Sequence, residues 1–224
     1  GGSRIVPLIS APDSPLAAIA DHELPHHAGP ERSVPATKSF IASLAALAAL
    51  VAEWAGDEEL GRALESLPGE LASAWSRDWS ALADGLGDAR GLYVIGRGLG
   101  LGVAQEAALK LKETCGLHAE AFSAAELRHG PMALVGPDFP LLVFRQSDET
   151  EASIDEAIAE VRARGAPVFV AGGGADGAVL LPSPEAHPAI EPMLQIQSFY
   201  RAAASLAVLR GFDPDRPPHL AKVT

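Results

Sequence analysis

Three side chains that can transfer protons lie close together in the middle of the sequence. Residues 104–135 read AQEAALKLKETCGLHAEAFSAAELRHGPMALV. Lys110 and Glu113 are spaced i, i+3, so a helix would present both on one face, and His129 follows in a loop before Gly-Pro. An amine, a carboxylate and an imidazole are groups that move protons on a small polar molecule. By spacing alone, the first two could instead be a surface ion pair and His129 a structural loop residue.

A glycine-rich turn precedes the helix that would carry this pair. Residues 96–102 read GRGLGLG, and the backbone N–H groups of such a turn, with the helix N-terminus behind it, can bind an anion. The turn is not the dinucleotide fingerprint, because Leu101 stands where the third glycine should be. Contact with an anion or a sugar and tight strand-to-helix packing both remain open.

The elements that must position these groups alternate regularly from residue 90 onward. Short apolar segments separated by amphipathic ones predict an α/β fold, with a doubly wound parallel sheet covered by helices on both faces. Ligands of such sheets bind beyond the carboxyl ends of the strands, where the helix with Glu113 begins. The expected strands are Leu92–Ile95, Leu141–Phe144, Val168–Ala171 and Val179–Leu181, and the expected helices are Val103–Cys115, Ile154–Arg164 and Pro192–Leu209.

The residues before position 88, where we place a domain boundary, are expected to form short strands and long helices. Pro68 and Gly69 predict a break between two of these helices. Trp75 and Trp79, at i, i+4 in the second of them, predict a packing seam. The expected strands are Ile5–Ile9 and His22–Pro25, and the expected helices are Thr37–Ala55, Asp57–Leu67 and Glu70–Leu86.

Composition argues against several classes of protein. The formal net charge of -12 disfavours nucleic acid and anionic membranes as partners. The single cysteine, Cys115, rules out an intrachain disulfide and fits a reducing compartment. The longest apolar run, Phe40–Ala52, is too short to span a bilayer, and no signal peptide is visible. We therefore expect an acidic, soluble, cytoplasmic protein, and no metal, because His22, His26 and His27 follow no established ligand spacing.

Four ordered motifs resemble the sugar isomerase (SIS) domain family. They are ALKLKE, HAEAF, AELRHGP and the C-terminal PPHLAKVT, and they match the isomerase half of glucosamine-6-phosphate synthases and the SIS-type glucosamine-6-phosphate deaminases. The resemblance implies a flavodoxin-like three-layer sandwich in two lobes. Residues 1–88 would be a partial first lobe with connecting helices, and residues 89–224 a complete second lobe with an active-site tail.

The resemblance also implies a role for each of four residues. Glu113 would transfer the proton between C1 and C2 of the sugar, and Lys110 would hold Glu113 ionised or bind an anionic intermediate. His129 would open the sugar ring and reach the site from a neighbouring subunit, which implies a homodimer. Lys222, in the tail, would stabilise a developing enolate or form a Schiff base with the sugar.

Three further residues would line a sugar phosphate, the expected substrate. They are Val34 and Ala36, ahead of the first long helix, and Ala221 in the tail. Synthases of the family usually have serine where Ala36 stands, so one hydroxyl contact is lost, and this change favours a deaminase. The sequence shows neither the serine- and threonine-rich loop with which the family binds the phosphate nor the glutaminase domain of the synthases.

Together these features predict a glucosamine-6-phosphate deaminase. It would convert glucosamine 6-phosphate and water to fructose 6-phosphate and ammonia without a metal or an organic cofactor. The alternatives are a glutaminase-less, aminotransferase-type phosphosugar isomerase and a regulatory module that binds a phosphosugar. The acidic charge argues against a regulator that binds DNA.

Overall fold

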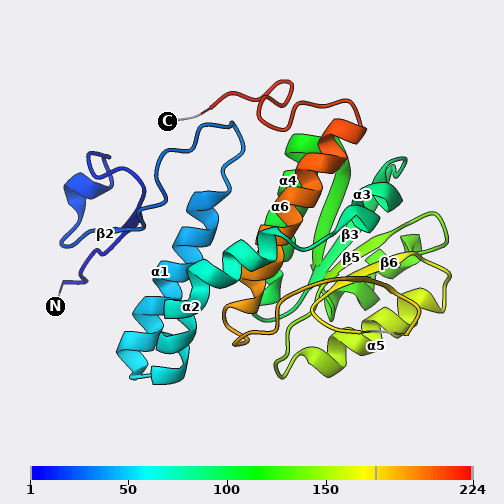
Figure 1. The fold of residues 1–224 in the computed structure, drawn as a ribbon, viewed down its shortest axis with the longest axis horizontal. Coiled ribbons are helices and arrows are strands. Elements are labelled where there is room, and N and C mark those ends of the chain that lie inside the picture. Colours follow the sequence, from blue (N-terminus) through cyan, green and yellow to red (C-terminus); the bar gives the residue numbers. More distant parts are fainter. Residues whose placement is uncertain (1, 175, 223–224) are drawn as a thin grey trace.

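A five-stranded parallel sheet forms the centre of the second part of the chain (Figure 1). The computed structural model describes residues 2–174 and 176–222, so Val223 and Thr224 of the tail motif lie outside the described residues. In the sheet, the first strand lies between the second and the third, the order of flavodoxin-like folds. This confirms the predicted α/β class. In sheet order the strands are β4 (His118–Ser123), β3 (Gly91–Gly96), β5 (Leu141–Phe144), β6 (Val168–Ala171) and β7 (Val179–Leu181).

Helices cover both faces of this sheet, because alternate side chains of each strand point to opposite sides. Leu92 and Val94 of β3 belong to the core shared with α3, α4 and α6, whereas Tyr93 and Ile95 pack with α5 and two short 3-10 helices. The strands β5 and β6 are buried along their whole length, as a sheet covered on both faces requires. The helices are α3 (Ser80–Leu86), α4 (Gly100–Cys115), α5 (Glu151–Arg162) and α6 (Glu191–Leu209), and the 3-10 helices are Glu126–His129 and Pro131–Leu134.

The edge strand β4 was not predicted. Its alanines and glutamate do not favour a strand, and it forms one because it pairs with β3 from end to end. His118 and Glu120 face solvent at this edge. The other predicted strands and helices of this part are present, with helix ends shifted by up to one turn.

The first part of the chain consists of a two-stranded sheet and two long helices. The strands β1 (Leu8–Ile9) and β2 (Leu24–Pro25) pair in parallel and are shorter than predicted. The helices α1 (Lys38–Ala55) and α2 (Glu58–Trp75) lie side by side (Figure 1). The chain turns between them at Gly56, whose left-handed backbone conformation (φ 66°) strains other residue types.

By length and composition, α1 could cross a membrane. The whole helix is longer than the apolar run Phe40–Ala52. The shortness of that run therefore does not exclude α1 as a membrane span. In the structure α1 packs against α2 and α6, but only Ile41 and Ala52, 11% of the helix, are buried. The cytoplasmic location stays a prediction.

The predicted helix break at Pro68 is wrong, because α2 continues through this residue. Proline removes one backbone donor and often ends a helix. Here Leu60, Leu67 and Ala74 are buried at heptad spacing, so one apolar stripe runs across Pro68 and packs against α1 and α6. Burial of that stripe outweighs the loss of one backbone hydrogen bond.

The predicted tryptophan seam is therefore also wrong. Trp75 is the last residue of α2 and is half exposed, whereas Trp79 precedes α3 and is buried. The indole Nε1 of Trp79 donates to the carbonyl oxygen of Pro182 at 2.8 Å. Trp79 thus ties the start of α3 to the end of β7.

Candidate active site

One cavity collects all the predicted site residues except His129. Its volume is about 650 Å³, and its walls come from residues 10–43, from one face of α4 and from the tail. These stretches are far apart in the sequence, and the fold brings them to one place. The predicted residues on its walls are Val34, Ala36, Lys110, Glu113, Ala221 and Lys222.

The α4 wall is a single helical face. Glu106, Leu109, Lys110 and Glu113 follow the i, i+3, i+4, i+7 spacing and all line the cavity. The sequence argument placed Glu113 beyond the carboxyl ends of the strands, and this is wrong. The carboxyl ends of the strands lie at the start of α4. At a rise of 1.5 Å per residue, Glu113 is about 20 Å along the helix axis from that start. The cavity instead lies against the later turns of α4.

A buried lysine holds two carboxylates together on this face. The Nζ atom of Lys110 is 2.6 Å from Glu113 Oε2 and 3.5 Å from Glu106 Oε1. Lys110 is 4% exposed and Glu106 is 8% exposed, whereas Glu113 is partly open to the cavity. Removing such a charge from water costs several kcal/mol unless it is paired. The pairing places an ammonium beside the carboxylate that is open to the cavity, where a general base would have to act.

A tyrosine completes the cluster from α6. The hydroxyl of Tyr200 donates to Glu106 Oε1 at 2.8 Å. Burial raises the pKa of Glu106, while Lys110 and the Tyr200 hydroxyl act in the opposite direction. Burial, followed by the charge of Glu106, raises the pKa of Tyr200, so the phenol stays neutral and available as a donor.

The tail is bound to the segment before α1. Lys222 Nζ donates to the carbonyl oxygens of Ser33 at 2.8 Å and Val34 at 3.3 Å. Asp215 accepts from Ser33 Oγ at 2.5 Å, and its carbonyl oxygen accepts from the Val34 backbone N–H at 3.2 Å. Figure 1 shows the tail running from α6 back towards this segment. These bonds put Ala221 and Lys222 on the cavity wall.

The start of α1 is fixed by a carboxylate. Glu31 Oε1 accepts from the backbone N–H groups of Thr37 at 3.1 Å and Ser39 at 2.8 Å, and from Ser39 Oγ at 3.0 Å. Partial burial works against the charged form, but these hydrogen bonds prevail and hold the pKa of Glu31 below its usual value. The cap orients the first turns of α1, whose Ser39 and Ser43 line the cavity.

His129 does not reach the cavity within the chain. It ends a 3-10 helix beyond β4 and is exposed. Its contribution from a neighbouring subunit, and the homodimer that this requires, stay predictions.

The glycine-rich turn is explained by packing. A Cβ atom on Gly100 would lie 2.0 Å from Gln146 Oε1, and one on Gly96 would lie 2.3 Å from the carbonyl oxygen of Gly100. Only glycine fits at such close approaches. This favours the packing interpretation of residues 96–102 over anion or sugar contact.

Several cavity residues were missed at the level of sequence. Glu106 precedes Lys110 by one helical turn, and the spacing that identified Glu113 could have found it too. Tyr200 carries no such signal, because it comes from another helix. His26, considered above only as a metal ligand, lines the cavity. The cavity residues not predicted are Ser10, His26, Ser39, Phe40, Ser43, Glu106, Leu109 and Leu220.

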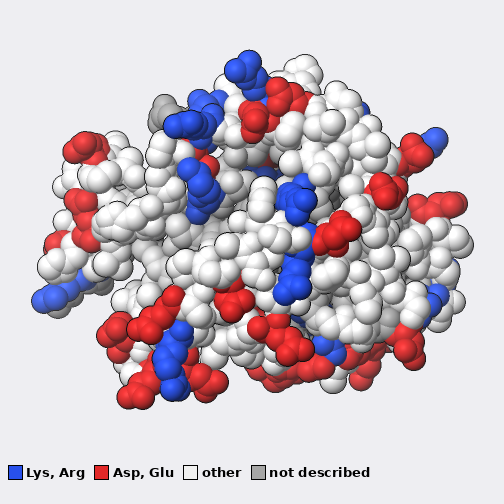
Figure 2. All heavy atoms as spheres, viewed as in Figure 1, with Lys and Arg blue, Asp and Glu red and all other residues white. Residues whose placement is uncertain are grey.

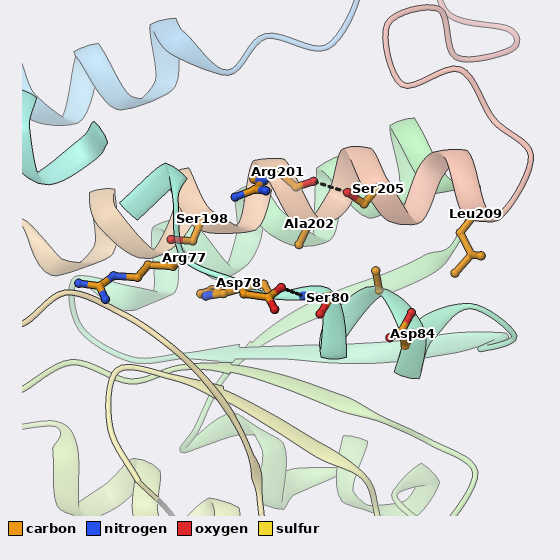
Figure 3. A pocket seen from close by; sticks show the side chains of 11 residues that line it. Arg77, Asp78, Ser80, Asp84, Ser198, Arg201, Ala202, Ser205 and Leu209 are labelled. Carbon is orange, nitrogen blue, oxygen red and sulfur yellow. Dashed lines mark hydrogen bonds between the residues drawn. The ribbon is translucent and has the colours of Figure 1, made fainter. Parts of the chain in front are cut away.

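A second cavity, of about 290 Å³, lies between α3 and α6 (Figure 3). Arg77 and Arg201 line it together with Asp78 and Asp84, so its formal charges balance. Asp78 Oδ1 accepts from the backbone N–H of Ser80 at 2.9 Å. This second cavity lacks the coupled buried charges of the first. The first cavity is therefore the better candidate for an active site.

The fold and the first cavity define a parallel α/β protein with a polar site equipped for proton transfer. Residues 85–173 match the SIS domain. The chain belongs to the SIS domain family, as its motifs indicated.

Relatives match almost the whole length of this chain. The glutamine–fructose-6-phosphate aminotransferase [isomerizing] of Zymomonas mobilis is 34% identical over 240 residues, which cover 99% of this chain and 40% of that protein. A proposed phosphosugar isomerase of Silicibacter pomeroyi is 42% identical, with a TM-score of 0.90 over 96% of this chain and 66% of that one. The glucosamine-6-phosphate deaminase of Thermotoga maritima is 26% identical, with a TM-score of 0.76 over 99% of this chain and 66% of that one. The chain thus spans about two fifths of the curated relative's length.

Proposed function

We propose that this chain carries the proton-transfer site of an enzyme acting on an amino-sugar phosphate, and that its reaction is deamination. Glucosamine 6-phosphate and water would give fructose 6-phosphate and ammonia. The observation that carries the proposal is the Lys110–Glu113 pair on a cavity wall that Lys222 of the tail also lines. The names of the relatives, an isomerising aminotransferase and a deaminase, support the same substrate class.

The reaction needs one proton to move between neighbouring carbons. In the open-chain aldose, Glu113 takes the proton from C2 while the carbonyl oxygen at C1 gains a proton, which gives an enolamine, and Glu113 then returns its proton to C1. The nitrogen at C2 is then an iminium group, and water adds at C2 and releases ammonia and one proton to leave the ketone. A well-placed general base accelerates such a step by about 10²–10⁴-fold.

The lysines stabilise the negative charge that develops during this transfer. Lys110 and Lys222 lie on the cavity walls and are local positive groups in a chain of net charge -12. Figure 2 shows acidic side chains gathered along the lower edge of its view, so an anionic ligand depends on such local groups. Ammonium groups aimed at an enolate act most strongly where water is excluded.

The second candidate is isomerisation without loss of the amine, as in the isomerase half of a synthase. The higher identity to the aminotransferase favours it. The two are separated by incubating the chain with glucosamine 6-phosphate and measuring ammonia and fructose 6-phosphate together. Equimolar release supports deamination. Interconversion of fructose 6-phosphate and glucose 6-phosphate, with no ammonia from the amino sugar, supports the alternative.

The role of Glu113 is tested with a matched pair of variants. Glu113→Gln keeps the shape of the side chain and should lower the rate by about 10²–10⁴-fold. Glu120→Gln, which changes an exposed carboxylate on β4, should not change it. Full activity of Glu113→Gln would refute the assigned role.

His129 is proposed to act across a homodimer interface. Mixing the inactive variants Glu113→Gln and His129→Asn should restore part of the activity, because a mixed dimer has one site with both residues intact. If His129→Asn is inactive and mixing restores nothing, the residue acts within its own subunit or only in folding.

A further inference from the structure

Tyr200 extends the charged cluster of α4 into α6. Its side chain is 8% exposed, and its hydroxyl donates to Glu106 Oε1 at 2.8 Å. Together with Lys110 it lines a neighbouring cavity of about 410 Å³, whereas Glu106 and Glu113 line the substrate cavity. Tyr200 therefore does not line the cavity that the substrate would occupy. It can affect that cavity only through its hydrogen bond to Glu106.

The cluster has more negative than positive charge. Two carboxylates share one buried ammonium, and neither Tyr200 nor any other group of α6 in the hydrogen-bonded cluster adds a positive charge. Among the described residues, the charged and titratable groups around Glu106 and Tyr200 are Lys110 and Glu113 of α4, His26 after β2, Glu31 before α1, Lys38 of α1, and Asp215 and Lys222 of the tail.

The phenol has a direct effect on the charge of Glu106. Burial raises the pKa of this carboxyl, and the hydroxyl of Tyr200 is one of the two groups that oppose the rise, the other being Lys110. A hydrogen bond to a carboxylate stabilises its ionised form. Without the hydroxyl, Glu106 would take up a proton at higher pH, and Lys110 would lose one of its two counter-charges.

We propose that Tyr200 is a positioning residue of the site: its hydroxyl fixes the Glu106 carboxylate, which in turn holds the Lys110 ammonium against Glu113. This rests on the function proposed above, in which Glu113 transfers the proton. With Glu106 neutral, the Lys110 ammonium would lose one of its two charged partners and would no longer be fixed against Glu113. Turnover then requires ionised Glu106, so its protonation sets the acid limb of the pH profile.

The test compares Tyr200→Phe with Tyr93→Phe. Tyr93, on β3, is 3% exposed and packs against Phe122 and Phe139 on the other face of the sheet, so its variant also removes a hydroxyl from a buried ring. For each, kcat and KM for glucosamine 6-phosphate are measured across acid and neutral pH. In parallel, ¹³C NMR follows the Glu106 carboxyl, assigned by its absence in Glu106→Gln.

In Tyr200→Phe, the acid limb of kcat should move up by about one pH unit. On that limb kcat should fall about tenfold, with KM changed less than about twofold. Tyr93→Phe should follow the wild type. A Tyr200→Phe profile that superimposes on the wild-type profile, or an equal shift in Tyr93→Phe, overturns the proposal. If the wild type lacks activity, the proposed function fails, and the Glu106 titration still decides: a higher pKa in Tyr200→Phe supports the positioning, and an unchanged one refutes it.

Discussion

Replacement of Lys110 by methionine tests whether the cluster on α4 is one coupled unit. Methionine keeps much of the length of the lysine side chain and removes its charge. The change would leave two carboxylates, Glu106 and Glu113, facing each other with no cation between them. Because Lys110 is 4% exposed, water cannot readily replace the ammonium.

The size of the effect follows from this geometry. At 2.6 Å, the attraction between Lys110 and Glu113 is about 6 kcal/mol for an effective dielectric constant of about 20. Desolvation of the two ions costs a similar amount, so the intact pair adds little net stability. Removing one partner leaves the desolvation uncompensated, and Lys110→Met should lower the free energy of unfolding by about 3–5 kcal/mol.

Urea denaturation at neutral pH and at about pH 4 measures this effect. Burial raises the pKa of Glu106, and its protonation removes the repulsion between the two carboxylates, so the loss should shrink at the lower pH. The double variant Lys110→Met/Glu106→Gln should recover about 1–2 kcal/mol. Lys112→Met, an exposed position in the same helix, is the matched control and should cost less than about 1 kcal/mol. A Lys110→Met loss below about 1 kcal/mol, or one independent of pH, would refute the coupling.

Three further predictions concern the framework of the site. Burial raises the pKa of the Cys115 thiol, so this single cysteine should resist a thiol reagent in the native protein and react on denaturation; rapid native labelling would contradict its burial. Glu31→Gln should destabilise the protein by about 1 kcal/mol at neutral pH. Because the folded pKa of Glu31 is lowered, this stabilisation exists above its unfolded pKa and is lost as the pH falls through the folded one, so a difference that does not shrink on acidification would contradict the role of Glu31 as a cap. Trp79→Phe removes the bond to Pro182 and part of a buried ring, and should cost about 1–3 kcal/mol in urea denaturation; an unchanged midpoint would exclude this.

Whether an interaction can be predicted from the sequence depends on how far apart its two residues lie along the chain. Lys110 and Glu113 could be paired because both lie on one helix, and local spacing determines which side chains share a face. The central strands could be predicted because burial on both faces requires continuous apolar segments. Glu106 was within reach of the same spacing argument. Tyr200 was not, since its bond to Glu106 joins residues 94 positions apart.

The errors arose where tertiary packing outweighs a local rule. Pro68 would end an isolated helix, but the buried stripe of α2 carries the helix past it. The alanines and glutamate of β4 do not favour a strand, and β4 forms because it pairs with β3. The general rule for ligands of parallel sheets placed Glu113 at the wrong end of α4. The rule describes sites built by the sheet alone, whereas this cavity also uses α1 and the tail.

The docking of the tail has a consequence for how the protein folds. The bond from Lys222 to Ser33 joins residues 189 positions apart, and closing such a long loop has an entropic cost that local contacts do not meet. Contacts of this kind form late, after helices and neighbouring strands. On refolding from denaturant, activity should therefore return more slowly than the far-ultraviolet circular dichroism of the helices. A chain stalled before this last step would have its sheet and its paired charges, yet no closed site in which to use them.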